Sequence, residues 1–175
     1  PLNAMEEMMT PDEMREKAID LFLKRLHCSQ VLATVGMEKL GVDDPAVIKA
    51  LGAFGGGIGG TGNICGALVG AVSVLGTMYS RSNLDEKENP RMWNATKAVM
   101  KNFEELTAEY GGINCCQIAR VDWMERDQVK EFYGSQDSRR QHCIRVVGDT
   151  ARALGELLEP EAERLAAKQA ESEKK

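Results

Sequence analysis

Residues 54–79 constrain the fold of this chain more than any other stretch. Six of the nine residues from Phe54 to Gly62 are glycine, and a glycine inside a helix costs roughly 1 kcal/mol relative to alanine. This segment is therefore predicted to form a special loop. The stretch that follows, from Asn63 to about Tyr79, is apolar on every side, which is typical of a helix buried all round. We expect it to be the central helix of the domain.

Apolar residues elsewhere recur at spacings of three and four, and strand signals are almost absent. We therefore expect an all-α fold, a single compact bundle of about five to six helices around the central apolar helix. The first helix opens at Thr10-Pro11, and if it continues, Cys28 lies near its end on the core side. The other helices are predicted over residues 44–54, 90–110, 114–121 and 139–158, with Trp123 and Phe132 in a less regular stretch.

The chain is long enough for one domain with a substantial core. It has 175 residues, of which 43% are hydrophobic, so it does not need disulfides for bulk stability. We assign residues 5–159 to a single helical redox or metal-binding domain. Residues 160–175 are charged and rich in alanine, and they are predicted to form a tail that is either a solvated helix or frayed.

The charge pattern argues against two classes of partner. The formal net charge is -5, and Lys and Arg are dispersed among Asp and Glu without the basic stripe that a phosphate backbone requires. We therefore expect no nucleic-acid partner. No run of about 18 uncharged apolar residues has the flanks of a membrane anchor, and no secretory signal is present. We expect a soluble, cytoplasmic protein without membrane insertion.

The cysteines lie far apart in the sequence, near predicted helix ends that can converge. In a reducing compartment an odd number favours free thiols, metal ligation or redox catalysis over structural disulfides. The first turn of a helix favours thiolate through its unpaired amides and macrodipole, so we expect lowered pKa values for Cys65 and Cys143. The alternative is that the cysteines are buried apolar fillers. The five are Cys28, Cys65, Cys115, Cys116 and Cys143.

The motif Cys65-Gly66-Ala67-Leu68-Val69-Gly70, together with the glycine tract before it, carries a family resemblance. With Cys28, Cys115 and Cys143 at their spacings, the chain resembles the C_GCAxxG_C_C family over about residues 16–158. The members are small helical proteins described as redox-active, so the resemblance implies a redox or metal-binding role. Similar modules occur in the split-Soret cytochromes c, which carry haem and an iron–sulfur centre. This chain has no CxxCH sequence, so the resemblance does not extend to covalent haem.

The resemblance implies that four characteristic cysteines form one site. Four thiolates can hold an iron–sulfur cluster, [2Fe–2S] or [4Fe–4S], for electron transfer or redox sensing, and this is the function we expect. They can also hold structural zinc in a zinc or interaction module, although such sites usually contain CxxC pairs, which are missing here. Without a cofactor, Cys65 would be the catalytic nucleophile of a thiol–disulfide oxidoreductase, with another cysteine resolving. The expected metal ligands are Cys28, Cys65, Cys115 and Cys143.

The glycine tract matches GxGxxG formally at Gly57, Gly59 and Gly62. The segment before it reads as helix and no Walker lysine follows, so the context argues against a nucleotide. Instead, the glycines are predicted to let the backbone approach a cluster and donate amide hydrogen bonds to its sulfurs. A tight turn beneath the central helix is the alternative. The predicted cofactor-binding glycines are Gly55, Gly56, Gly57, Gly59 and Gly66.

Other residues leave alternatives open. His27 and His142 each precede a family cysteine and are candidates for ligands or for tuning the thiolates, although neighbours on a helix point about 100° apart. Cys116 exceeds the family set and is a spare ligand, a resolving thiol or a packing residue. The small-residue face at Gly66 and Gly70 fits either a homodimer or packing within the domain. The expected partner is an unidentified redox protein.

Overall fold

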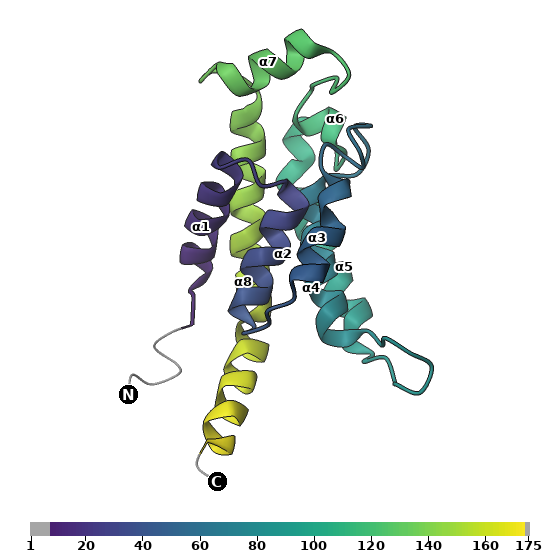
Figure 1. Ribbon diagram of the computed structural model, residues 1–175, viewed down its shortest axis with the longest axis vertical. Helices are drawn as coiled ribbons and strands as arrows, with labels where there is room; N and C mark the ends of the chain where they lie inside the picture. The colour runs from purple at the N-terminus through teal and green to yellow at the C-terminus, as the bar shows by residue number, and fades with distance from the viewer. Residues whose placement is uncertain (1–7, 174–175) are drawn as a thin grey trace.

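Helix α8, which spans Arg140–Ser172, is the longest element, and the other helices are arranged along and beside it (Figure 1). The computed structural model describes residues 8–173, which contain eight α-helices, two short 3-10 helices and no strand. The all-α prediction is confirmed. The number of helices exceeds the expected five to six for two reasons. The first predicted helix is divided in two, and the stretch predicted to be less regular contains a further helix. Residues 5–7 of the predicted domain and residues 174–175 of the predicted tail lie outside the described part.

Helix α8 begins where the sequence predicts but does not end at Pro160. It continues for another twelve residues, and Ala162 in this part is only 2% exposed. The helix packs against α1, α2, α4 and α5. Its buried face includes Val147, Leu154 and Leu158. The predicted boundary at residue 160 therefore falls within a continuous helix.

The prediction that Cys28 lies near the end of the first helix is wrong. Helix α1 spans Pro11–Leu23, and its start has the predicted cap. The side chains of Thr10 and Glu13 each accept a hydrogen bond from the other residue's backbone amide. The chain then turns at Arg25, which has a left-handed backbone with φ of 73°. The amides of Arg25 and Leu26 donate to carbonyls of the last turn, as in a Schellman motif. Cys28 consequently opens a second helix, α2, which spans Cys28–Lys39.

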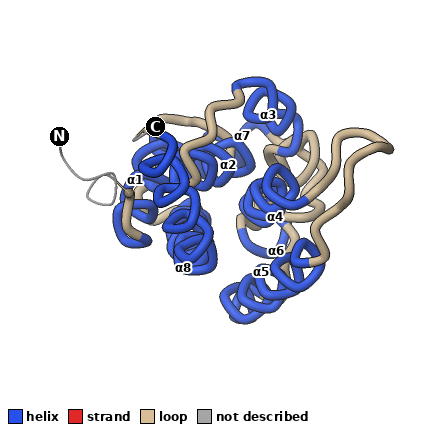
Figure 2. The backbone as a smooth tube through the Cα atoms, turned by 90° about the horizontal axis from the view of Figure 1, so that it is seen from below, coloured by secondary structure: helices blue, strands red, loops and turns tan. Residues whose placement is uncertain are grey.

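Helix α4, which spans Gly66–Tyr79, occupies the centre of the bundle as predicted and packs against α2, α5 and α8. Figure 2 shows these helices close to end-on. Gly70 allows the close approach of α2, because a Cβ atom there would lie 2.3 Å from the carbonyl oxygen of Ser29. The small-residue face of α4 is therefore covered by α2 of the same chain, and a homodimer would need another surface.

The glycine loop lies between α4 and a short helical segment. Helix α3 spans Pro45–Ala50 and continues as a 3-10 helix over Leu51–Phe54. The loop that follows contains five glycines with positive φ, and Ile58 among them also has a left-handed φ of 65°. The predicted special loop is confirmed. It lies beside the start of α4, in the upper part of Figure 1.

The segment after α4 forms the remaining wall of the bundle. Helix α5 spans Arg91–Thr107, a 3-10 helix continues to Tyr110, and Gly111 ends it with a φ of 95°. The short helix α6 spans Cys115–Ile118. The stretch predicted to be less regular contains a further helix, α7, over Arg126–Gly134. Its helical pattern was missed because it is short and mostly polar and has one fully buried side chain, Phe132.

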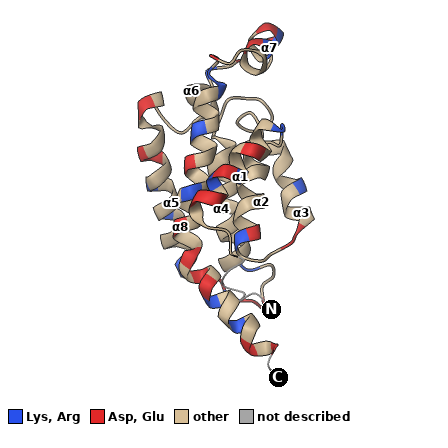
Figure 3. Cartoon of the chain, turned by 90° about the vertical axis from the view of Figure 1, so that its left-hand side faces the viewer, with Lys and Arg blue, Asp and Glu red and all other residues tan. Residues whose placement is uncertain are grey.

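Charges of both signs are interspersed along the helices, and α8 shows this alternation along its length (Figure 3). No helix among residues 8–173 combines the length and apolar character that a bilayer crossing requires.

Candidate functional site

Four cysteines lie at the N-terminal ends of four different helices. Cys28 is the first residue of α2, and Cys65 immediately precedes α4 as its N-cap. Cys115 is the first residue of α6, and Cys143 is the fourth residue of α8. The structure brings all four to the wall of one cavity of about 320 Å³.

Backbone pairing holds two of these cysteines next to each other. Ile64 and Asn114 form an antiparallel bridge between the end of the glycine loop and the start of α6. The amide of Cys65 donates to the carbonyl of Ile113 at 3.0 Å, and the amide of Cys115 donates to that of Asn63 at 2.7 Å. Segments 50 residues apart in sequence are therefore locked together at the site.

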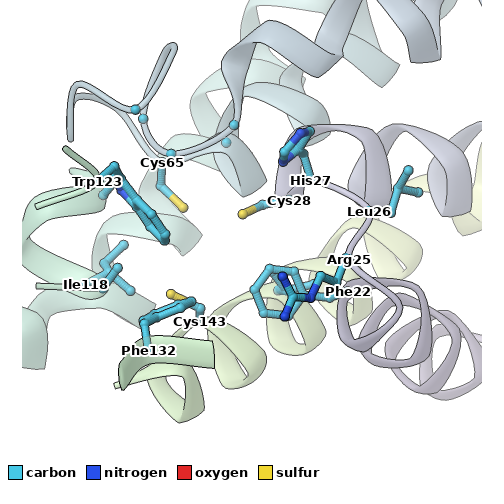
Figure 4. Close-up of a pocket in the computed structure, with 18 of the residues that line it drawn as sticks. Phe22, Arg25, Leu26, His27, Cys28, Cys65, Ile118, Trp123, Phe132 and Cys143 are labelled. Carbon is cyan, nitrogen blue, oxygen red and sulfur yellow. The ribbon is translucent and has the colours of Figure 1, made fainter. Parts of the chain in front are cut away.

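The cavity has a sulfur-lined part and an apolar wall (Figure 4). In this view the thiols of Cys28, Cys65 and Cys143 project into the same space. Trp123 and Phe132 flank them on one side, and Phe22 lies on the other. The two rings nearest the thiols, Trp123 and Phe132, pack edge to face at 5.1 Å between centroids. The cavity is thus lined mainly by aromatic and aliphatic groups and by the glycine loop.

The glycine loop forms the side of the cavity that carries no side chains. Gly57 is buried, has a left-handed φ of 69°, and has no room for a larger residue. A Cβ atom there would lie 2.6 Å from the backbone of Asn63 and 2.7 Å from the Cβ of Cys115. All five predicted cofactor-binding glycines line the cavity: Gly55, Gly56, Gly57, Gly59 and Gly66.

The loop uses some of its amides internally. Gly55 donates to the carbonyl of Gly52, and Gly59 donates to that of Ala53. Within residues 8–173, Gly56 and Gly57 donate to no backbone carbonyl. If the loop donates to a bound group as predicted, these two amides are the candidates.

Trp123 is a site residue that the sequence analysis missed, because it assigned this residue only to a less regular stretch. Its indole Nε1 donates to the sulfur of Cys115 at 3.4 Å. Its ring also lies close to the glycine loop, since a Cβ atom at Gly56 would be 3.4 Å from its Cδ1. No sequence motif marks this residue, and only the packing of the segment after α6 brings it to the cavity.

The expectation of lowered pKa values for Cys65 and Cys143 is wrong. Burial raises the pKa of Cys65 to about 12, and amide hydrogen bonds from Ala67 and Leu68 offset only part of this. Burial likewise raises the pKa of Cys143, and the other three site cysteines raise it further. Burial also raises the pKa values of Cys28 and Cys115. In an apolar cavity the cost of desolvating a thiolate exceeds the stabilisation by a helix start.

The other candidate site residues, Cys116, His27 and His142, differ in whether they line the cavity. Cys116 is exposed and does not line the cavity, so Cys115 is the member of the pair that faces the site. His27 lines the cavity and caps α2. His142 does not line it; its ring contacts Tyr110 at 4.7 Å, and its Nδ1 lies 3.1 Å from the carbonyl of Ile118.

Within the part of the chain that the structure describes, no three His, Cys, Asp or Glu side chains are grouped closely enough to hold one metal ion. The four thiols instead surround a cavity. Thiol sulfur is a ligand for soft metals, for zinc and for iron–sulfur clusters. The four thiols are therefore a donor set of this kind, and the glycine loop leaves one wall of the cavity free of side chains.

The fold and this site define a class, the small all-helical proteins with four cysteines converging on one cavity. A family model described as "Putative redox-active protein (C_GCAxxG_C_C)" matches residues 26–157, which include all four cysteines. The chain belongs to this family, and the resemblance inferred from the sequence is confirmed. No curated protein and no solved structure matches the chain.

Proposed function

We propose that this protein holds an iron–sulfur cluster through Cys28, Cys65, Cys115 and Cys143 and uses it for electron transfer or redox sensing. The observation that carries the proposal is the convergence of four thiols from four helix starts on one apolar cavity. Four cysteine thiolates are the usual ligand set of such clusters. The family's description as redox-active agrees with this role.

The size of the cavity favours a cluster over a single zinc ion. Tetrahedral zinc holds four sulfurs at about 2.3 Å from the metal, so its ligands crowd around one point. Here the thiols line a space of about 320 Å³, and the glycine loop keeps one wall free of side chains. A cluster of several iron and sulfide ions fits such a space better.

The protein's own groups would stabilise negative charge on the bound sulfurs. The amides of Ala67 and Leu68 act to lower the pKa of Cys65, and the indole of Trp123 donates to the sulfur of Cys115. The starts of α2, α4 and α8 add the positive ends of their macrodipoles. When bound, the cluster would supply one-electron exchange, and the apolar wall would lower the polarity around it. We further propose that the chain works in the reducing cytoplasm with a partner redox protein.

A thiol–disulfide oxidoreductase is the second candidate, because backbone pairing holds Cys65 and Cys115 side by side. The nucleophile in such an enzyme is a thiolate. The raised pKa of Cys65 keeps this thiol protonated near neutral pH. This weighs against the second candidate.

The test is to assay iron and acid-labile sulfide on protein purified without oxygen and to record its visible spectrum. Matching amounts of iron and sulfide are expected, and Cys65→Ser should abolish them. Cys116→Ser is the matched control and should retain them, because Cys116 is exposed and away from the cavity. A colourless, metal-free protein, or equal tolerance of both substitutions, would contradict the proposal. Zinc without sulfide would indicate a structural zinc module instead.

A further inference from the structure

Arg140 carries a positive charge in an unfavourable position. It is the first residue of α8, where the helix macrodipole already presents its positive end. The first turn of α8 contains no acidic residue that could compensate. A cation at this position is therefore destabilised unless negative charge lies nearby.

The guanidinium group of Arg140 also lacks ordinary partners. Its Nε is buried and has no hydrogen-bond acceptor among the described residues, and its one hydrogen bond there is a long one to the carbonyl of Leu23, at 3.4 Å. No carboxylate of residues 8–173 lies within 4.0 Å of it. By contrast, each of the three other arginines inside α8 forms an ion pair: Arg145, Arg152 and Arg164.

Arg140 does not line the cavity itself but lies over two aromatic rings of its wall. Its guanidinium carbon lies 5.7 Å from the ring centre of Phe22 and 5.2 Å from that of Tyr133, and both rings line the cavity. Arg140 also precedes Cys143 by three residues, so the two side chains share one face of α8.

We propose that Arg140 is the counter-cation of the cysteine site, placed behind the Phe22 and Tyr133 wall to balance a negatively charged cluster and to raise its reduction potential. This inference rests on the proposed function. A cluster bound by four thiolates is anionic and becomes more so on reduction, so a nearby cation favours the reduced form. Arg25 lines the cavity and lies over the Tyr133 ring at 4.2 Å, but its side chain is exposed, so its charge is screened by water.

The experiment measures the midpoint potential of the cluster-loaded protein by redox titration of its visible spectrum. Arg140→Met keeps the aliphatic stem and removes the charge, and it should shift the potential to a more negative value. Arg140→Lys retains the charge, so its midpoint potential should stay close to that of the parent protein. The control is Arg139→Met, which removes the neighbouring charge. Arg139 is exposed, donates to the carbonyl of Arg120 and, unlike Arg140, lies over neither ring of the cavity wall, so its loss should leave the potential unchanged.

A second measurement applies to the metal-free protein. Without the cluster the charge of Arg140 is uncompensated, so Arg140→Met should raise the thermal midpoint of unfolding of the metal-free protein. In the cluster-loaded protein the same substitution should lower the midpoint. A lower midpoint in the metal-free variant would overturn the inference. An unchanged potential in a loaded Arg140→Met protein, or equal shifts for Arg139→Met and Arg140→Met, would overturn it while leaving the proposed function intact. Absence of iron from the parent protein would overturn the proposed function itself.

Discussion

Cys115 and Cys116 are adjacent in sequence, but their thiols have different surroundings. Cys115 is 8% exposed, lines the cavity and accepts a hydrogen bond from Trp123. Cys116 is exposed, and its amide donates to the carbonyl of Gly62 at 2.9 Å. Alkylating reagents attack an accessible thiolate, so burial and a raised pKa both slow the reaction. The two thiols should therefore differ strongly in reactivity.

In the metal-free protein near neutral pH, Cys116 should react with iodoacetamide at least about tenfold faster than Cys65, Cys28 or Cys143. The site thiols stay protonated because burial raises their pKa values. Mass spectrometry of digested samples over a time course would measure the rate at each cysteine, and Cys116→Ser should remove the fast phase. Alkylation of Cys65 as fast as that of Cys116 would contradict this prediction and favour the thiol–disulfide candidate.

The site was only partly predictable at this scale. The glycines and the starts of α4 and α6 are visible in the sequence, because glycine and capping residues mark loops and helix ends locally. The protonation of Cys65 was not predictable, since it depends on how much water the folded cavity excludes. The role of Trp123 was missed because no motif marks it: it reaches Cys115, eight residues earlier, only through the packing of the segment after α6.

At the scale of the secondary-structure elements, the break between α1 and α2 could not be predicted from the sequence. A Schellman motif normally has glycine at its left-handed position, and this chain has Arg25 there. The apolar spacing continues across the turn, so the sequence predicted one helix where the fold has two. The consequence is functional, because the turn converts Cys28 from the end of one helix into the start of another.

The packing of α2 on α4 positions Cys28 beside Cys65, and Gly70 makes it possible. Gly70→Ala should destabilise the protein by about 1–3 kcal/mol, because the new Cβ would lie 2.3 Å from the Ser29 carbonyl and 2.9 Å from the Leu32 Cβ. The control is Gly76→Ala in the same helix, where no atom lies within 4 Å. That change should stabilise α4 by about 0.5–1 kcal/mol.

Urea denaturation of both variants would give the free energies of unfolding. The comparison isolates the effect of helix contact from that of helix propensity, since both substitutions add the same methyl group to α4. Similar values for the two variants would mean that α2 does not approach α4 as closely as the structure has it.

At the scale of the whole molecule, the site joins segments that lie far apart in the sequence. Cys28 and Cys143 lie 115 residues apart, and the segments that carry Cys65 and Cys115 meet through one bridge and its flanking hydrogen bonds. The side chains around Phe132 form a small cluster separate from the main core, and Cys115 belongs to that cluster while Cys65 belongs to the main one. A group bound by both cysteines would therefore cross-link the two clusters.

Removing the bound group should consequently destabilise the whole chain. A ligand that binds only the folded state stabilises it, and for a protein of this size a change of 1 kcal/mol shifts the midpoint by about 2–4 °C. We expect the cluster-loaded protein to unfold at least about 5 °C above the metal-free protein in anaerobic calorimetry. Cys65→Ser treated with iron and sulfide in the same way should unfold at the temperature of the metal-free parent.

Hydrogen exchange should slow on loading at the first turns of α2, α4 and α8, where the cysteines lie. Equal midpoints for loaded and metal-free protein, with iron and sulfide verified in the loaded sample, would show that the four cysteines do not link the two clusters.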